Sequence, residues 1–163
     1  MTTAPAVCWY PGQWLGGLRE ASDSRWLKEH GIKRVITCAV EISREQIALD
    51  DDIEWIRYEM EDSRFRDDRG RIQDVMWYYL EDAVRRVEES ITRGIPSLLH
   101  CVQGWQRSPT VLTCVLVKRY GWEPSEVIEM MRRFREGSFE RECHFESLIS
   151  EWGRRQFFNL RKK

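Results

Sequence analysis

The sequence predicts a single α/β domain with a central, mostly parallel and twisted sheet flanked by helices. Short apolar or β-branched runs alternate along the chain with segments of helical periodicity. The chain has 163 residues, enough for one core, and its 42% hydrophobic and 33% charged content is typical of a soluble globular protein. No repeat, low-complexity tract or Pro/Gly/Ser-rich linker divides it. We therefore expect one domain over residues 1–163, with its core at about residues 7–158.

The first half of the chain is predicted to supply most of the strands. Apolar, β-branched stretches suit a strand pair over residues 7–17 and single strands over residues 34–40 and 53–58. Pro11-Gly12 is the expected turn of the pair. Ser22, Asp23 and Ser24 are N-cap candidates for a short helix that ends near Gly31. Residues 61–71 are strongly polar and irregular, which predicts a loop.

The second half is predicted to be mainly helical. Apolar residues recur three and four apart through residues 72–93, and Gly94 suits the end of that helix. Residues 108–120 are apolar nearly all round, which predicts a central and buried helix. Further helices are expected over residues 124–134 and about 144–157.

The most informative stretch lies between two of these elements. The apolar run 95–99 reads as a short buried strand, and Cys101, Gly104, Arg107 and Ser108 follow before the apolar helix. A loop between a strand end and a helix N-terminus aims backbone N–H groups inward and makes an anion site. An arginine there can grip two oxygens of a tetrahedral oxyanion. The same groups would stabilise a thiolate, so this pattern predicts a sulfur nucleophile facing a bound phosphate.

Two other interpretations of Cys101 remain open at this point. A cysteine after an apolar strand is often a small core residue. His100-Cys101 could also be half of a zinc site, but the chain has no CxxC or HxxxH pair to complete it. The acidic run 50–52 lacks the alternating ligands and glycine of a calcium loop. We favour the nucleophile and expect neither a metal nor a cofactor.

The pattern His100-Cys101-x-x-Gly104-x-x-Arg107-Ser108 resembles the HCxxGxxR[S/T] signature of cysteine-dependent protein phosphatases. The flanking chain resembles the small, atypical dual-specificity phosphatases in particular. The likeness is carried by residues 10–16, 30–36 and 144–148, so it spans almost the whole chain. It implies the fold of the protein tyrosine phosphatases.

The resemblance assigns a role to each residue of the motif. Cys101 would attack phosphorus and form a phosphocysteine, which water then hydrolyses. Arg107 would bind two equatorial oxygens, and Ser108 would donate a hydrogen bond to the departing sulfur. His100 would brace the loop as a support residue without carrying protons. The phosphate would also be held by the backbone amides of the following residues: Val102, Gln103, Gly104, Trp105, Gln106 and Arg107.

The leaving oxygen needs a proton from a carboxylic acid on a second loop. The resemblance places this acid in residues 61–71, where the candidates are Asp62, Asp67 and Asp68. Asp62 directly follows the preceding strand, as in the family, but lies further from Cys101 than the family spacing suggests. Asp68 lies nearer to that spacing. We favour Asp62, on the view that residues 64–71 are an insertion, and keep Asp68 as the alternative.

Two features of the sequence bear on the substrate. The variable positions of the motif hold no lysine or extra arginine, whereas similar phosphatases of inositol phosphates or RNA 5′ ends tend to carry basic residues there. Trp105 is expected at the rim, either against a phosphotyrosine ring or packed on a neighbouring loop. Gln106 departs from the serine often found before the arginine.

The expected function is hydrolysis of phosphotyrosine and phosphoserine/phosphothreonine monoesters in proteins. The alternatives are a phosphatase of phosphoinositides or RNA 5′ phosphates, and a catalytically silent phospho-binding module. A net charge of −1 and short apolar runs favour neither nucleic acid nor membrane as a partner. Five cysteines without a small-scaffold spacing, and no apolar signal segment, favour the cytoplasm, with the nucleus as the alternative. The oligomeric state is left open.

Overall fold

The computed structural model describes residues 4–139 and 145–161, with the side chains of the last helix described as far as Phe157. Its centre is a sheet of five strands in the order β1-β2-β5-β3-β4. β1 pairs antiparallel with β2, and every other pair is parallel. The strands are β1 (Val7–Tyr10), β2 (Gln13–Gly16), β3 (Arg34–Cys38), β4 (Glu54–Tyr58) and β5 (Ser97–His100). The predicted α/β class with a mostly parallel sheet is confirmed.

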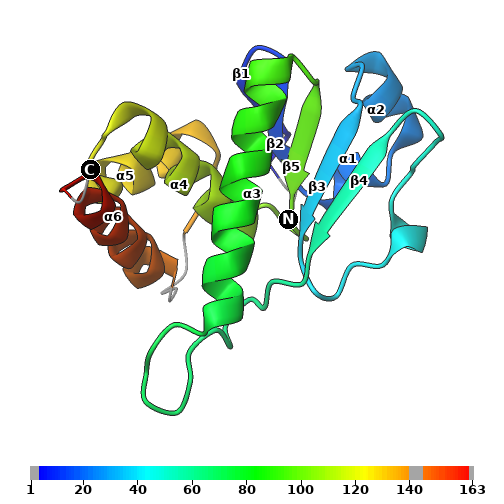
Figure 1. Cartoon of the computed structure of the whole chain (residues 1–163). Helices are drawn as coiled ribbons and strands as arrows, with labels where there is room; N and C mark the ends of the chain where they lie inside the picture. Colours follow the sequence, from blue (N-terminus) through cyan, green and yellow to red (C-terminus); the bar gives the residue numbers. More distant parts are fainter. Residues whose placement is uncertain (1–3, 140–144, 162–163) are drawn as a thin grey trace.

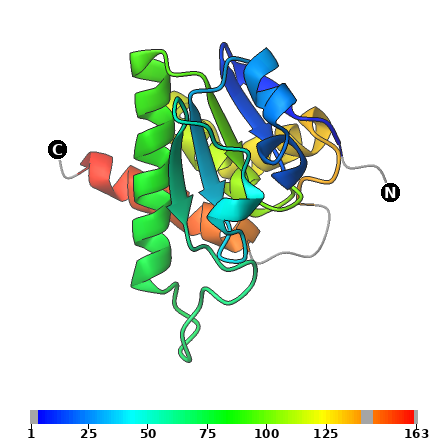
Figure 2. The same ribbon diagram turned by 90° about the vertical axis from the view of Figure 1, so that its right-hand side faces the viewer.

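Helices cover both faces of the sheet (Figure 1). The short helices α1 and α2 lie on one side and the long α3 on the other (Figure 2). A short 3-10 helix, Arg44–Gln46, follows β3. The helices are α1 (Leu18–Ala21), α2 (Ser24–Glu29), α3 (Asp74–Arg93), α4 (Arg107–Tyr120), α5 (Pro124–Phe134) and α6 (Phe145–Arg161). Among the described residues, no helix is both long and apolar enough to cross a membrane.

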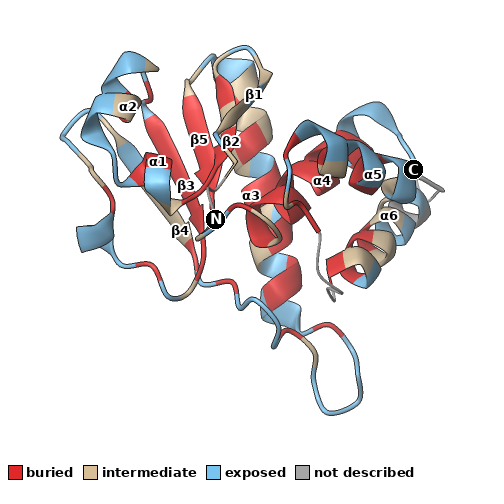
Figure 3. Ribbon diagram, turned by 180° about the vertical axis from the view of Figure 1, so that it is seen from behind, coloured by how far each residue is buried: buried red, intermediate tan, exposed pale blue. Residues whose placement is uncertain are grey.

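Alternation along the strands creates two hydrophobic cores, one on each face. Ile36 and Leu99 point into the core shared with α3, α4, α5 and α6. Their neighbours Val35 and Leu98 point into the core under α1 and α2. Because successive side chains of a strand face opposite ways, each central strand serves both layers. The buried residues therefore concentrate in the central strands and in α4 (Figure 3).

The predicted helix boundaries are close to those observed. The helix expected from residue 72 begins at Asp74, because Ile72 instead forms an isolated bridge with Arg66. The last helix extends four residues beyond the predicted end, and its expected start at His144 lies outside the described residues. The strand expected at 95–99 runs from Ser97 to His100. The outer limits of the core, residues 7 and 158, stay a prediction.

The parallel arrangement gathers the loops that follow β2, β3, β4 and β5 at one edge of the sheet. β5 is the central strand, so the loop after it lies between those after β2 and β3. In open α/β sheets this carboxyl edge is where ligands bind. The motif residues therefore lie at the edge where a site is expected.

Candidate active site

Residues 101–106, called here the Cys101 loop, join the end of β5 to the first residue of α4. The side chain of Cys101 is buried beside the N-terminus of this helix. α4 has eleven consecutive buried residues from Arg107 to Val117. The helix dipole adds positive potential where the loop meets it.

Every carbonyl of the Cys101 loop is held by a donor outside the loop. In a trans peptide the N–H and the C=O point in opposite directions. Because these carbonyls point outward to their donors, the N–H groups of residues 102–107 point to the inside of the loop. Cys101 O accepts from His100 Nδ1 at 2.9 Å, and Val102 O accepts from Leu18 N at 2.8 Å. Gln103 O and Gly104 O both accept from Arg135 Nη1, at 3.2 and 2.6 Å. Trp105 O accepts from Phe139 N at 2.8 Å, and Gln106 O accepts from Thr110 N at 2.9 Å and Thr110 Oγ1 at 2.6 Å. The result is a bowl of inward amides.

Gly104 makes the tight curve of the bowl possible. Its φ of +73° belongs to the left-handed region that favours glycine. A Cβ at this position would lie 2.4 Å from Gly16 O and 2.8 Å from Arg135 Nη1. The loop is thus pressed against the end of β2 and the Arg135 guanidinium, with no room for a side chain.

Ser108 and His100 contact Cys101 directly. Ser108 Oγ donates to Cys101 Sγ at 3.3 Å, and both residues are buried. His100 donates from Nδ1 to the Cys101 carbonyl, while its Nε2 accepts from Thr37 Oγ1 at 2.6 Å. Burial lowers the pKa of His100 to about 4, so the ring is neutral near pH 7. Trp55 Nε1 completes the chain by donating to Thr37 Oγ1 at 2.7 Å.

Arg107 is buried and held by a partner that the sequence analysis did not identify. Its Nη1 and Nη2 donate to the two carboxylate oxygens of Glu41, and Nη1 also donates to Met60 O at 3.0 Å. Nε has no hydrogen-bond partner, although Asp62 Oδ1 lies 3.5 Å away. Although burial opposes both effects, the bond between Arg107 and Glu41 lowers the pKa of the carboxyl and raises that of the guanidinium.

Of the three candidate acids, Asp62 is the one that lies beside Arg107. Asp67 Oδ1 instead accepts from the backbone N–H groups of Arg69 and Arg71, both at 2.9 Å. The bond from Arg71 holds the pKa of Asp67 below its usual range. Asp68 is exposed in the same turn. The structure therefore brings Asp62 to the bowl and leaves the other two in the outer turn.

Trp105 lies against a neighbouring turn. A Cβ on Gly137 would lie 2.5 Å from Trp105 Nε1, so the indole packs on the segment after α5. The Trp105 carbonyl is also bonded to Phe139 N in that segment. Of the two expectations for this ring, packing on a neighbouring loop is the one with contacts in the structure.

The sequence analysis missed two functional candidates, Glu41 and Arg135. Glu41 carried a weak signal, because it closely follows a buried strand that ends at the same edge as β5. Arg135 carried none. It follows α5 as an ordinary basic residue, yet it is 1% exposed and bonds to two carbonyls of the Cys101 loop.

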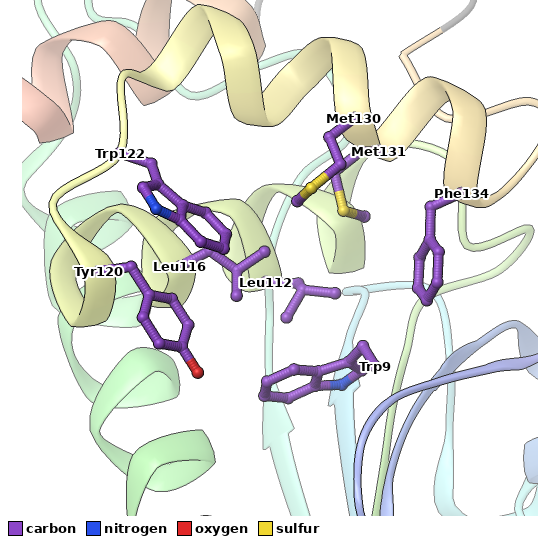
Figure 4. Close-up of a pocket in the computed structure, with 8 residues that line it drawn as sticks. All are labelled: Trp9, Leu112, Leu116, Tyr120, Trp122, Met130, Met131 and Phe134. Atoms are coloured by element: carbon purple, nitrogen blue, oxygen red, sulfur yellow. The ribbon is translucent and has the colours of Figure 1, made fainter.

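An apolar pocket of about 240 Å³ opens elsewhere, between β1, α4 and α5 (Figure 4). It contains no residue of the Cys101 loop. Its lining is Trp9, Leu112, Leu116, Tyr120, Trp122, Met130, Met131 and Phe134. Within residues 4–139 and 145–161, no group of three or more His, Cys, Asp or Glu side chains could hold a metal ion.

Comparisons with solved structures agree on the fold. DUSP15 superimposes with a TM-score of 0.76 at 18% identity, covering 98% of this chain and 96% of that one. Human DUSP28 gives 0.74 at 19% identity, covering 93% and 94%. Human tyrosine phosphatase-like serine/threonine/tyrosine-interacting protein gives 0.75 at 16% identity, covering 94% and 98%. At these identities the likeness establishes the fold alone.

Sequence comparisons establish the family. The chain is 26% identical over 128 residues to dual specificity protein phosphatase 1B of Arabidopsis thaliana, which covers 78% of this chain and 70% of that protein. Residues 13–155 match the family described as dual specificity phosphatase, catalytic domain. That match covers most of the chain and includes the whole motif from His100 to Ser108. The protein therefore belongs to the dual specificity phosphatase catalytic-domain family.

Proposed function

We propose that the protein hydrolyses phosphotyrosine and phosphoserine/phosphothreonine monoesters of proteins through a phosphocysteine at Cys101. The observation that carries the proposal is the inward amide bowl, with the Cys101 sulfur at its start and, at its end, an Arg107 Nε that has no hydrogen-bond partner. Such a bowl matches the equatorial oxygens of a phosphoryl group in transfer. The family match supports the reaction class.

In the first step the Cys101 thiolate attacks phosphorus and the ester oxygen departs. The amides of residues 102–107 and the Arg107 guanidinium stabilise the charge on the equatorial oxygens. Asp62, at 3.5 Å from Arg107 Nε, gives its proton to the departing oxygen. An alkoxide from serine or threonine needs this proton more than a phenoxide from tyrosine does.

In the second step water hydrolyses the phosphocysteine. Asp62, now a carboxylate, accepts a proton from the attacking water. Phosphate forms and the sulfur departs as a thiolate, stabilised by the hydrogen bond from Ser108 Oγ at 3.3 Å. His100 is neutral and bonded at both ring nitrogens, which suits a support role and leaves no nitrogen free to carry protons.

A protein substrate is favoured over an inositol lipid or an RNA 5′ end. Val102, Gln103, Trp105 and Gln106 carry no charge, so the rim of the bowl lacks cations for additional phosphates. Two of the four arginines of residues 61–71 are already bonded to other groups. Arg66 bonds to Gly70 O, Ser147 and Glu151, and Arg71 pairs with Asp67.

A silent binding module is the main alternative from another class. One of the similar structures is named a tyrosine phosphatase-like interacting protein. A module that only binds phosphate has no need of a buried nucleophile, a sulfur-directed hydroxyl and a nearby acid, and this chain has all three. We therefore favour an enzyme. The cytoplasmic location stays a prediction from cysteine usage.

The test is turnover of p-nitrophenyl phosphate in the presence of EDTA by wild type and Cys101→Ser. We expect metal-independent turnover that falls by on the order of 10⁴-fold or more in the variant. Trapping of a phosphoprotein by acid quench during turnover would identify the intermediate. Absence of turnover in the wild type, with retained binding of phosphopeptides, would favour the binding module.

A panel of substrates then separates the two enzyme hypotheses. Peptides bearing phosphotyrosine, phosphoserine and phosphothreonine are compared with inositol lipids and triphosphorylated RNA. Higher kcat/KM on the peptides supports the protein substrate. A preference for the lipids or the RNA would replace it.

A further inference from the structure

We propose that the apolar pocket between β1, α4 and α5 is a docking site for the phosphoprotein substrate, which inserts there an aromatic side chain flanked by acidic residues. The proposal deepens the proposed function and rests on it. The pocket has a volume of about 240 Å³, and its lining includes no residue of the Cys101 loop. It would therefore hold a part of the substrate other than the phosphorylated residue.

Exposed apolar side chains gather around this pocket. Among residues 4–139 and 145–157, seven large apolar side chains are exposed, and four of them line the pocket. These four are Tyr120, Trp122, Met130 and Phe134, each 40–44% exposed. A contiguous apolar patch of this kind on a soluble protein marks an interaction site. Aromatic residues and methionine are also the residues enriched in protein interfaces.

The helix α5 carries a wider apolar stripe than the core covers. Val127 and Met131 are buried, whereas Met130 and Phe134 extend the same stripe at helical spacing and stay partly exposed. Figure 4 shows both methionines and Phe134 directed toward the side of the pocket where Trp9 of β1 lies. Aromatic walls favour an aromatic occupant through stacked and edge-to-face contacts, and methionine side chains adapt to its shape.

Two cations without a carboxylate partner lie beside the pocket. The guanidinium of Arg119 lies over the rings of Tyr10 and Tyr120, 5.7 and 5.8 Å from their centroids. Arg133 is exposed in the last turn of α5. Within the part of the chain that the structure describes, neither forms an ion pair, whereas the basic residue next to each is paired with a carboxylate. Acidic residues of a docked segment would supply the missing partners.

The charges of α5 also separate along its length. Glu123 and Glu126 lie in the cap and the first turn, where the helix dipole favours negative charge. Arg133 lies at the opposite end, beside Phe134. Met130 precedes Arg133 by three residues, so the two side chains are neighbours on the helix surface. The charge complementarity is therefore with an acidic segment at the Phe134 end of the pocket.

That end of the pocket adjoins the bowl. Phe134 directly precedes Arg135, whose guanidinium bonds to two carbonyls of the Cys101 loop. The turn at Gly137 packs against Trp105 of the same loop. Leu112 lies in the second turn of α4, so the base of the pocket begins within about 8 Å of the bowl along the helix axis. One substrate chain can therefore occupy both sites, and docking raises the effective concentration of its phosphorylated residue at the bowl.

The first experiment measures docking without turnover. The probe is an acetylated peptide of the sequence Asp-Glu-Phe-Glu-Asp, titrated into wild type with ¹⁵N-labelled tryptophan. We expect the indole NMR signals of Trp9 and Trp122 to shift saturably, with a dissociation constant on the order of 0.1–1 mM. The signals of Trp14 and Trp26, which pack under α1 and α2, should stay unchanged.

Matched peptides test the chemistry of the occupant. Alanine in place of phenylalanine should weaken binding at least tenfold, and lysine in place of the four acids at least threefold. Shifts confined to Trp105, or no saturable shift, would overturn the docking site. So would a concentration-dependent dimer in sedimentation that shifts the same indoles without peptide, because the occupant would then be a second copy of the chain.

The second experiment asks whether docking serves the substrate. A phosphotyrosine peptide is joined to the probe sequence by Gly/Ser linkers of four, six, eight or ten residues, and kcat and KM are compared with those of the unjoined phosphopeptide. We expect the best linker to lower KM at least fivefold with kcat within twofold, because docking binds ground state and transition state alike. Equal KM values would overturn the proposal and leave the proposed function standing. If neither peptide is hydrolysed, the proposed function fails, and the indole shifts still report whether the pocket binds.

Substitutions at the rim locate the effect. Met130→Glu places a carboxylate in the mouth of the pocket and should abolish the ratio of KM values between unjoined and joined peptides. Arg133→Gln should reduce it at least twofold. Val75→Glu makes the same apolar-to-acid change at a 47% exposed position of α3, and Arg25→Gln removes an exposed arginine of α2. Both controls should keep the wild-type ratio. An unchanged ratio in Met130→Glu would place the docking elsewhere.

Discussion

The Cys101 loop and the polar loop of residues 61–71 both reach Arg107, but they are fixed in opposite ways. Six carbonyls of the Cys101 loop are bonded to donors outside it, from α1, α4 and the segment after α5 among others. The outer turn of the polar loop bonds mainly within itself, through Asp67, Arg69 and Arg71. It extends away from the body of the fold (Figure 2).

Under the proposed function, the difference follows from what each loop contributes to the site. The bowl must hold several donors at fixed distances from one anion, so its backbone is bonded on all sides. The polar loop delivers a single carboxylate, and only its start, at Asp62, needs to be near the bowl. Beyond it, Phe65 is buried in the core, and only the exposed outer turn of residues 67–70 has no contact with the bowl that the chemistry would need. Paired substitutions in the two loops test this contrast.

The largest contrast is expected between Gly104→Ala and Gly70→Ala. Both glycines have positive φ, +73° and +77°. The new Cβ would meet Gly16 O at 2.4 Å in the first case and nothing within 4 Å in the second. We expect kcat/KM to fall by about 10³-fold in Gly104→Ala, because inward amides are displaced. Gly70→Ala should lose only about 1 kcal/mol of stability. Steady-state kinetics and thermal unfolding measure both, and near-wild-type activity in Gly104→Ala would refute the rigid bowl.

The next contrast is between two aspartates of the polar loop. We expect Asp62→Asn to lower kcat by about 10²- to 10³-fold on alkyl phosphates, and to abolish the high-pH limb of the pH–rate profile. The loss should shrink with activated aryl phosphates, whose leaving groups need no proton. Asp68→Asn should stay within twofold. If Asp68→Asn lost the high-pH limb and Asp62→Asn kept it, the acid would be Asp68.

A smaller contrast is expected between the arginines that support each loop. Arg135→Met leaves the carbonyls of Gln103 and Gly104 without their donor in a buried place, at a cost of about 1–3 kcal/mol each. We expect a lower melting temperature and a loss of roughly tenfold or more in kcat/KM. Arg66→Met removes surface contacts with Gly70 O at 2.7 Å, Ser147 Oγ at 2.8 Å and Glu151 at 3.4 Å, each of which is worth less than about 1 kcal/mol. Equal kinetic losses in the two variants would show that the loops are held alike.

The last prediction concerns stability in acid, not the rate near pH 7, and tests the buried ring of His100. Its pKa is lowered from 6.5 to about 4 by burial, so between these values the unfolded chain binds a proton that the native protein does not. Stability from this group is therefore intact above pH 6.5 and is lost as the pH falls to 4, by about 3 kcal/mol. His100→Asn should show a flatter dependence over that range in urea unfolding, although it is less stable at pH 7. An unchanged slope would mean that the native ring takes up the proton.

The two loops also differ in how far the sequence predicted them. Cys101, Gly104, Arg107 and Ser108 lie within eight residues of one another, so local spacing sets much of their geometry. The position of Asp62 was better indicated by the end of the preceding strand than by its separation from Cys101. The bridge between Arg66 and Ile72 closes the intervening residues into a turn beyond Asp62. The view that residues 64–71 are an insertion stays a prediction.

Glu41 and Arg135 mark the limit of prediction from one sequence. Each meets the site only because tertiary packing brings a distant segment to the Cys101 loop or to Arg107. No periodicity, cap or motif distinguishes them from other charged residues of the chain. The predicted sheet could narrow the search for Glu41, because Glu41 follows a strand that ends at the same edge as the motif. The contact of Arg135 with the Cys101 loop could be found only from the three-dimensional structure.

The outward bonding of the Cys101 loop has a consequence for which esters can enter. A phosphate monoester presents three unesterified oxygens to the inward amides and to Arg107 Nε. A phosphodiester presents two, so one buried donor would face an esterified oxygen, which is a weaker acceptor and carries a bulky substituent. Under the proposed function, we therefore expect intact nucleic acid backbones and phospholipid diester linkages to be poor substrates.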